Sequence, residues 1–301
     1  MLTHRLAALS SLLALLFATL CQAVPNDNFA DDRARDIVGG RKVLITVTQN
    51  SIEPRVVLPP ELLVAHRFDI VAAQRAYSEK SQQLTMQVLQ DSVPLIQALI
   101  DYDFNTPPQS ALRPAVENSS WLRAQDIEFS EHGTVDFVLD KLDESDTRQM
   151  LLLYTNYYTD PMCATIVVDL RISLLVRRIP KGKLRADRFK PRYIPYQQSI
   201  RSVVTLANAD PKDRKKNIAR WAADNGQRAR QALDIGIAAL ARLAPLSIEL
   251  DETQAKDWRT RGKRELREIG GTLGWIRERE GNAILMIDAR DGAWTRKQIM
   301  E

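Results

Sequence analysis

The sequence predicts an α+β fold: a mainly antiparallel sheet covered by long helices, followed by a small C-terminal helix and a three-stranded β-meander. Two patterns support this prediction. In several segments, apolar and β-branched residues alternate with polar ones, which is the two-residue period of a strand with one buried face. Over residues 210–245, apolar residues instead recur at helical spacing.

Residues 1–23 have the three parts of a secretory signal peptide. Arg5 supplies the charged start, residues 6–20 are uncharged and mostly apolar, and the small side chains of Cys21 and Ala23 frame a cut after Ala23. A transmembrane anchor needs about 20 apolar residues, so an uncleaved anchor is the less favoured alternative. We expect a bacterial protein exported to the periplasm or beyond, with no transmembrane segment after cleavage.

The two cysteines bear on lipid attachment and on disulfide formation. Lipid attachment at Cys21 is disfavoured because Leu20 precedes it, whereas bacterial lipoprotein signals resemble one another in having a small residue there. A cut after Ala23 leaves Cys163 as the one cysteine from Val24 onward, so no intrachain disulfide can form. The apolar neighbours of Cys163 predict a buried thiol; intermolecular pairing and a reactive thiol are the alternatives.

The processed chain divides into three predicted parts. Residues 24–40 are polar and acidic without periodicity and are expected to form a flexible leader. Residues 41–250 form the α+β domain, and residues 251–301 form a C-terminal module of one helix and the β-meander. The composition, 45% hydrophobic and 27% charged, is that of an ordinary globular protein.

Four segments of the α+β domain have the periodicity of strands. Residues 41–49 alternate and supply the first strand. Residues 164–178 alternate without a break, and segments 150–159 and 198–206 are predicted to pair with them as the antiparallel centre of the sheet. A long basic connection, 178–197, would join the last two of these strands.

The region between the first strand and the sheet centre is predicted to contain two helices. Residues 68–100 are rich in Ala, Gln, Leu and Met. Pro94 is expected to divide them into one helix ending near Asp91 and another beginning at Ser92, because proline lacks an amide donor and clashes with the preceding turn. Residues 105–125 contain three prolines and are expected to be loop.

The long helix is predicted to begin at Asp210 and to end at Pro245. Asp210 would be the N-cap and Pro211 the first helical residue, which are favoured positions for both residue types. The apolar stripe of this helix needs a partner surface, and the apolar face of the sheet is the expected one.

The C-terminal module is predicted mainly from its turns. Residues 253–269 are expected to form a charged helix closed by Gly270-Gly271. Asp291-Gly292 is a strong hairpin signal because a type I′ turn needs positive φ. The three strands of the meander would be 271–280, 283–290 and 293–300.

Residue types that carry chemistry are present without a recognisable motif. His66, His132 and Cys163 lie far apart in the sequence, and no HExxH, CxxC or GxSxG arrangement occurs. We therefore expect no metal and no cofactor, and the sequence identifies no catalytic residue. Further candidates, each more simply explained as ordinary structure, are the turn with Glu128, Glu131 and His132, the carboxylate pair Asp101 and Asp103, and the tyrosines Tyr154, Tyr157 and Tyr158.

The net charge of +4 hides a strong asymmetry along the chain. Residues 24–176 carry a balance of −9, and residues 177–301 carry a balance of +12. Positive charge is densest in residues 177–192, the basic segment, which holds eight Lys and Arg residues against one Asp. The predicted binding residues are Arg177, Arg178, Lys181, Lys183, Arg185, Arg188, Lys190 and Arg192.

The basic segment predicts an anionic partner. Arginine and lysine interleaved with aromatic residues such as Phe189 can hold phosphates or lie at a membrane surface. For an exported protein we expect anionic lipid head groups, an envelope polymer or an acidic protein surface, and no nucleic acid. The alternatives are a solvated loop and a segment that folds onto the acidic N-terminal half.

These observations predict an exported, periplasmic, non-catalytic binding or assembly protein of the bacterial cell envelope. In general layout the chain resembles the small α/β domains of accessory lipoproteins and periplasmic subunits of Gram-negative envelope machines. The alternative function is an envelope hydrolase with a site assembled from distant residues. That function would require His66 or His132 to meet a carboxylate or Cys163 in one pocket.

Overall fold

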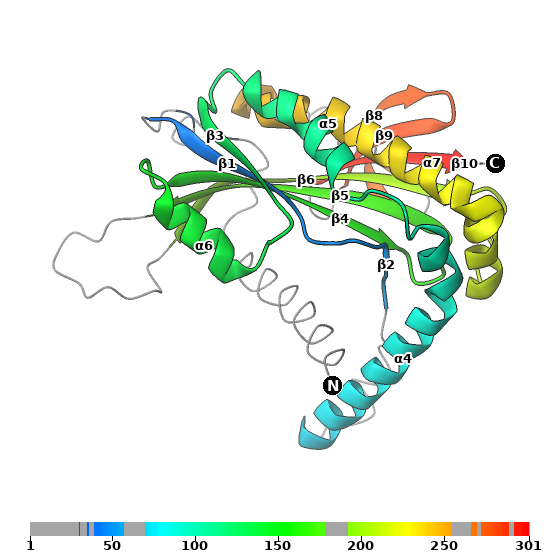
Figure 1. The fold of residues 1–301 in the computed structure, drawn as a ribbon. Helices are drawn as coiled ribbons and strands as arrows, with labels where there is room; N and C mark the ends of the chain where they lie inside the picture. Colours follow the sequence, from blue (N-terminus) through cyan, green and yellow to red (C-terminus); the bar gives the residue numbers. More distant parts are fainter. Residues whose placement is uncertain are drawn as a thin grey trace.

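A computed structural model shows one large mixed sheet with helices packed on it (Figure 1). Helices α5 and α7 lie on one face of this sheet, and α6 lies on the other (Figure 1). The α+β fold class is therefore confirmed. The predicted signal peptide, residues 1–23, lies outside the described residues, which are 30, 35, 39–56, 70–177, 192–254, 266–269, 272–288 and 292–300.

Ten strands and four helices make up the described elements. The strands are β1 (Arg41–Val47), β2 (Glu53–Pro54), β3 (Ala124–Ser130), β4 (Gln149–Thr159), β5 (Thr165–Arg177), β6 (Arg192–Leu206), β7 (Leu266–Ile269), β8 (Thr272–Glu280), β9 (Ala283–Asp288) and β10 (Trp294–Met300). The helices are α4 (Ile70–Ala98), α5 (Thr106–Glu117), α6 (Val135–Glu144) and α7 (Arg214–Glu249).

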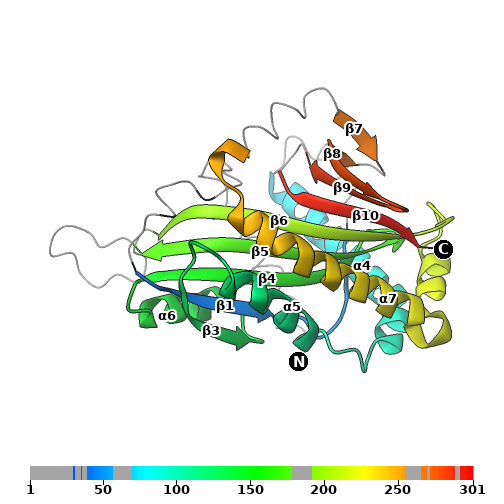
Figure 2. The same ribbon diagram turned by 90° about the horizontal axis from the view of Figure 1, so that it is seen from above.

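The sheet order is β3-β1-β4-β5-β6-β10-β9-β8-β7 (Figure 2), with β2 pairing to β4 off this path. The prediction of a mainly antiparallel sheet is only partly right. The central pairs β4–β5 and β5–β6 are antiparallel, but β1 runs parallel to β3 and β4, and β10 runs parallel to β6. Helices lie between the strands of each parallel pair in the chain, as crossover connections require.

The sheet centre lies where the alternating pattern placed it. On β5, Ile166, Val168 and Leu170 all face the main core and are fully buried. The third central strand, β6, begins at Arg192, earlier than the predicted start of strand 198–206. The connection between β5 and β6 is correspondingly shorter than expected.

The long helix α7 differs from its prediction in three ways. Its N-cap is Asp213, whose side chain accepts a 3.0 Å hydrogen bond from the backbone N–H of Lys216. It continues past Pro245 to Glu249. It is also interrupted at 223–226, where three consecutive residues from Asp224 to Gly226 have positive φ.

The proline-based predictions for the preceding region are wrong. Helix α4 continues through Pro94 without division. Its packing against α7 through buried residues such as Leu95 offsets the missing amide donor. Helix α5 occupies the predicted loop, because its first two prolines, Pro107 and Pro108, lie in the first turn, where amide groups have no helical partner.

The C-terminal strands continue the main sheet. The meander β8–β9–β10 is confirmed, and β10 pairs with β6, so that this meander joins the sheet centre. The predicted helix 253–269 is wrong at its end, because Leu266–Ile269 forms strand β7. The predicted division of the chain at residue 250 stays a prediction.

The main core lies between α7 and the sheet. Gly236 of α7 faces Val168 of β5 so closely that a Cβ atom on Gly236 would overlap the Val168 side chain. Of the described helices, α7 alone is long and apolar enough to cross a membrane by length and composition, and 56% of its apolar window is buried inside the fold. A smaller cluster between α6 and the opposite face includes Leu44, Val138 and Met150.

We predict that Gly236→Ala destabilises the protein by about 1–3 kcal/mol, because the added methyl group overpacks the contact with Val168. Without that contact, alanine would stabilise a helix by about 0.5–1 kcal/mol relative to glycine. The sign of the change in unfolding free energy, measured by urea denaturation, therefore tests the contact.

A double-mutant cycle with Val168→Ala supplies the control for this prediction. The smaller side chain leaves room for the methyl group, so Gly236→Ala should cost less in that background than in the wild type. Equal costs in both backgrounds would contradict the close approach of α7 and β5.

Candidate functional site

The basic segment connects β5 and β6 at one end of the sheet. Arg177 ends β5, Arg192 begins β6, and the two are backbone partners in the antiparallel pair. The two ends of the segment are thus held together by neighbouring strands. Six of the predicted binding residues lie outside the described ranges: Arg178, Lys181, Lys183, Arg185, Arg188 and Lys190.

The side chain of Arg177 is engaged within the fold. Its guanidinium donates to the Asp143 carboxylate of α6, and its backbone N–H donates to the Arg148 carbonyl at 3.0 Å. For Arg177, the structure therefore shows contact with the acidic N-terminal half, which the sequence left open as an alternative to partner binding.

A neutralised ion network lies on the sheet face covered by α6. Glu128 of β3 is 2.9 Å from Lys42 of β1 and 3.0 Å from Lys141 of α6. Burial acts to raise the pKa of the Glu128 carboxyl, but the hydrogen bonds from the two lysines lower it below its usual value. These charges hold α6 to the sheet.

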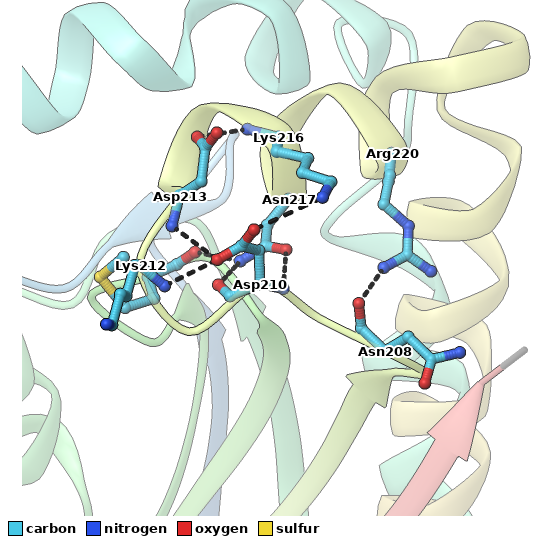
Figure 3. Close-up of polar contacts among 8 residues, drawn as sticks. Asn208, Asp210, Lys212, Asp213, Lys216, Asn217 and Arg220 are labelled. Carbon is cyan, nitrogen blue, oxygen red and sulfur yellow. Dashed lines mark hydrogen bonds and ion pairs between the residues drawn. The ribbon is translucent and has the colours of Figure 1, made fainter.

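A second run of basic residues, at 212–220, precedes and begins α7 (Figure 3). Several of its side chains have partners within the fold. Lys216 lies 3.4 Å from Asp210, and the Arg220 guanidinium donates to the Asn208 carbonyl at 3.0 Å (Figure 3). The same guanidinium also donates to the Ala207 carbonyl at 2.7 Å.

Hydrogen bonds of the Asp210 carboxylate and the Asn217 amide hold the turn before α7. The Asp210 carboxylate accepts hydrogen bonds from the backbone of Lys212 and Asp213 at 2.9 and 3.2 Å (Figure 3). Asn217 is buried, and its amide donates to the carbonyls of Met162 and Asp210 at 3.0 and 2.8 Å. This run therefore orders the start of the helix.

The two basic runs lie at opposite ends of the sheet. The basic segment precedes β6 and the second run follows it, so one strand of fifteen residues, about 50 Å long, separates them. Two acidic residues accompany the second run, because Asp213 lies within it and Asp210 just before it. The basic segment has one acidic residue, Asp187. The second run is thus accompanied by more acidic residues than the basic segment.

Sequence reasoning missed a charged cluster on the sheet face opposite α7. Asp169 of β5 is buried, and its carboxylate lies 3.1 Å from Arg201 of β6 and 3.5 Å from Arg171. Arg201 also lies 3.9 Å from Asp288 of β9. Strand alternation placed Asp169 on the polar face, but its partners on other strands depend on pairings that the pattern does not specify.

The cysteine and histidine candidates show no shared site among the described residues. Cys163 is fully buried in the β4–β5 turn, with its Sγ 3.3 Å from the Thr159 hydroxyl, and burial raises the pKa of its thiol. The His132 ring packs edge-on against Phe137 at 5.8 Å. His66 lies outside the described residues. In the described ranges, no group of three or more His, Cys, Asp or Glu residues could hold a metal ion.

The carboxylate pair Asp101 and Asp103 serves the fold. Asp101 pairs with Arg230 of α7, and this hydrogen bond lowers the pKa of its carboxyl. Asp103 accepts from the backbone N–H groups of Asn105 and Thr106 at 2.9 and 3.0 Å, which also lowers its pKa. Both carboxylates therefore organise the chain before α5.

The three tyrosines divide between core and sheet surface. Tyr157 is buried and donates to the Phe104 carbonyl at 2.8 Å, while Tyr154 is within 2.9 Å of the Thr48 hydroxyl. Arg55 lies over the Tyr158 ring at 3.5 Å, and burial raises the pKa of Tyr158 to about 12. These contacts are those of packing residues.

No family model matches the sequence, and searches of curated proteins and of solved structures gave no match.

We predict that Cys163 is unreactive in the folded protein. At pH 8 its buried thiol has a raised pKa and forms little thiolate, which is the reactive species. In the chain beginning at Val24, labelling by a disulfide reagent should be on the order of 100-fold slower than in the urea-unfolded chain. Equal labelling rates in the two states would show an accessible thiol.

Proposed function

We propose that the protein is an exported, non-catalytic binding or assembly protein of the bacterial cell envelope that contacts an anionic partner through its basic segment. The observation that carries this proposal is the contrast between the two basic runs. Four cations of the second run, Arg214, Lys215, Lys216 and Arg220, lie beside acids or carbonyls of the fold. The sequence 178–192 holds seven Lys and Arg residues and one Asp.

The attachment of the basic segment supports a binding role. β5 and β6 are the two longest strands of the sheet, with thirteen and fifteen residues, and both belong to its centre. A connection between two such strands is fixed at both ends by backbone pairing and core packing. Contact with a partner would therefore be transmitted to the most stable part of the fold.

The compartment and the charge together favour an anionic surface as the partner. Each Lys or Arg close to an anionic membrane contributes about 1 kcal/mol of binding. Arg177 is left out of the count of seven Lys and Arg residues because its guanidinium pairs with Asp143.

We predict that the triple substitution Arg178→Glu, Lys181→Glu and Lys183→Glu weakens binding to phosphatidylglycerol vesicles by on the order of 100-fold or more at low salt. The loss follows from removing three attractive charges and adding three repulsive ones. Co-sedimentation with vesicles measures it. Phosphatidylcholine vesicles should bind neither protein, and added salt should weaken binding of the wild type.

The matched control reverses three exposed cations elsewhere: Lys80→Glu, Lys212→Glu and Arg228→Glu. This variant has the same net charge as the first but an intact basic segment. It should retain most of the binding. Equal losses in the two variants would show that only total charge matters, and unchanged binding in the first would refute the proposal for lipid.

A further inference from the structure

Helix α4 has apolar residues on two faces. The inner face packs against α7, and Val88, Leu95 and Leu99 at this contact are buried. The outer face carries Met86 and Val93, which are 56% and 44% exposed. A surface helix normally has one apolar stripe, which faces the core. The part of the chain that the structure describes therefore leaves the second stripe of α4 uncovered.

The outer residues follow a heptad pattern. Met86, Leu89, Val93, Ile96 and Ile100 are spaced by three, four, three and four residues, which is the a/d spacing of helices that pair by knobs-into-holes packing. We call these five residues the α4 seam. Leu89 is 38% exposed, Ile96 is half-buried, and Ile100, just beyond the helix end, is 82% exposed.

Exposed apolar side chains are concentrated on this seam. Of the seven large hydrophobic residues that are exposed in the described part of the chain, four belong to it. Single exposed apolar residues are normal on a protein surface, but a contiguous group marks an interaction site. Figure 1 shows that α4 extends away from the sheet, and its outer residues Met86, Leu89 and Val93 are exposed among the described residues.

The residues beside the seam are uncharged, and this selects the partner. The flanking e and g positions hold Gln83, Gln90 and Gln97 on one side and Thr85 and Ser92 on the other. A helix that lies on a membrane normally has Lys or Arg beside its apolar face. A charged partner would find no opposite charge beside the seam. An identical helix could pair with it without repulsion, because neither helix carries charge at these flanking positions.

We propose that the α4 seam pairs with the α4 seam of a second copy of the chain and forms a two-fold symmetric dimer. Such an interface is self-complementary, because the same patch serves on both sides. The seam spans two heptads, fewer than the three or four of an independent coiled coil. The anchoring of α4 on α7 holds the helix in place for pairing, and the dimer is weak and concentration-dependent.

The test compares two substitutions on the same helix by sedimentation of the processed protein. The wild type should approach twice the mass of one chain at about 100 μM. Val93→Glu places a charge in the centre of the seam and should weaken dimerisation at least tenfold. Gln87→Glu adds the same charge on α4 outside the seam and should leave dimerisation unchanged.

Thermal unfolding of both variants shows whether each remains folded, as expected for exposed positions. A monomeric wild type over the whole concentration range would overturn the proposal. Equal effects of Val93→Glu and Gln87→Glu would also overturn it. A monomer whose binding to phosphatidylcholine vesicles is abolished by Val93→Glu would assign the seam to lipid instead.

Discussion

The contact between α7 and the centre of the sheet organises the rest of the fold. Gly236 lets the helix approach β5 until Val168 touches its backbone. The end of α7 then holds the N-terminal half in place: the Trp121 indole donates to the Ile248 carbonyl at 2.9 Å, and the Glu249 carboxylate accepts from both Ser119 and Ser120. α4 packs on the same helix, and so the position of the exposed α4 seam depends indirectly on this contact.

The parts of the fold that sequence could predict are those with local signals. The unbroken alternation of β5 specified its buried face, because each residue's side follows from its neighbours. The relative direction of paired strands could not be predicted in this way. The parallel pairing of β1 with β4 depends on how the intervening helices pack on the sheet, which is not a local property of either strand. Prolines misled for a related reason: Pro107 and Pro108 lie in a helical first turn, which only the three-dimensional path distinguishes from a loop.

The candidate site was predicted from charge density, which is a local property, but the pairing of individual charges is not local. Arg177 meets Asp143 through the packing of α6 on the sheet, thirty-four residues away in sequence. Asp169 meets Arg201 through strand register. The two basic runs look alike in composition, and only their acids differ. Arg177 and Arg214, one from each run, both pair with an acid outside their own run, so the partner of a given cation follows from the fold.

The placement of the α4 seam and the basic segment has a consequence for binding. α4 packs beside the start of α7, where its residue Asp91 pairs with Arg214, and this is the sheet end at which β6 finishes. The basic segment leaves from the other end of β6, beside α6 (Figure 1). A dimer formed through α4 would therefore have its interface away from the ends of β5 and β6 that the basic segment joins. Two weak contacts with one anionic surface reinforce each other, because the second forms at high effective concentration once the first is made. A weak dimer would thus bind more tightly to a continuous surface than to a small soluble anion.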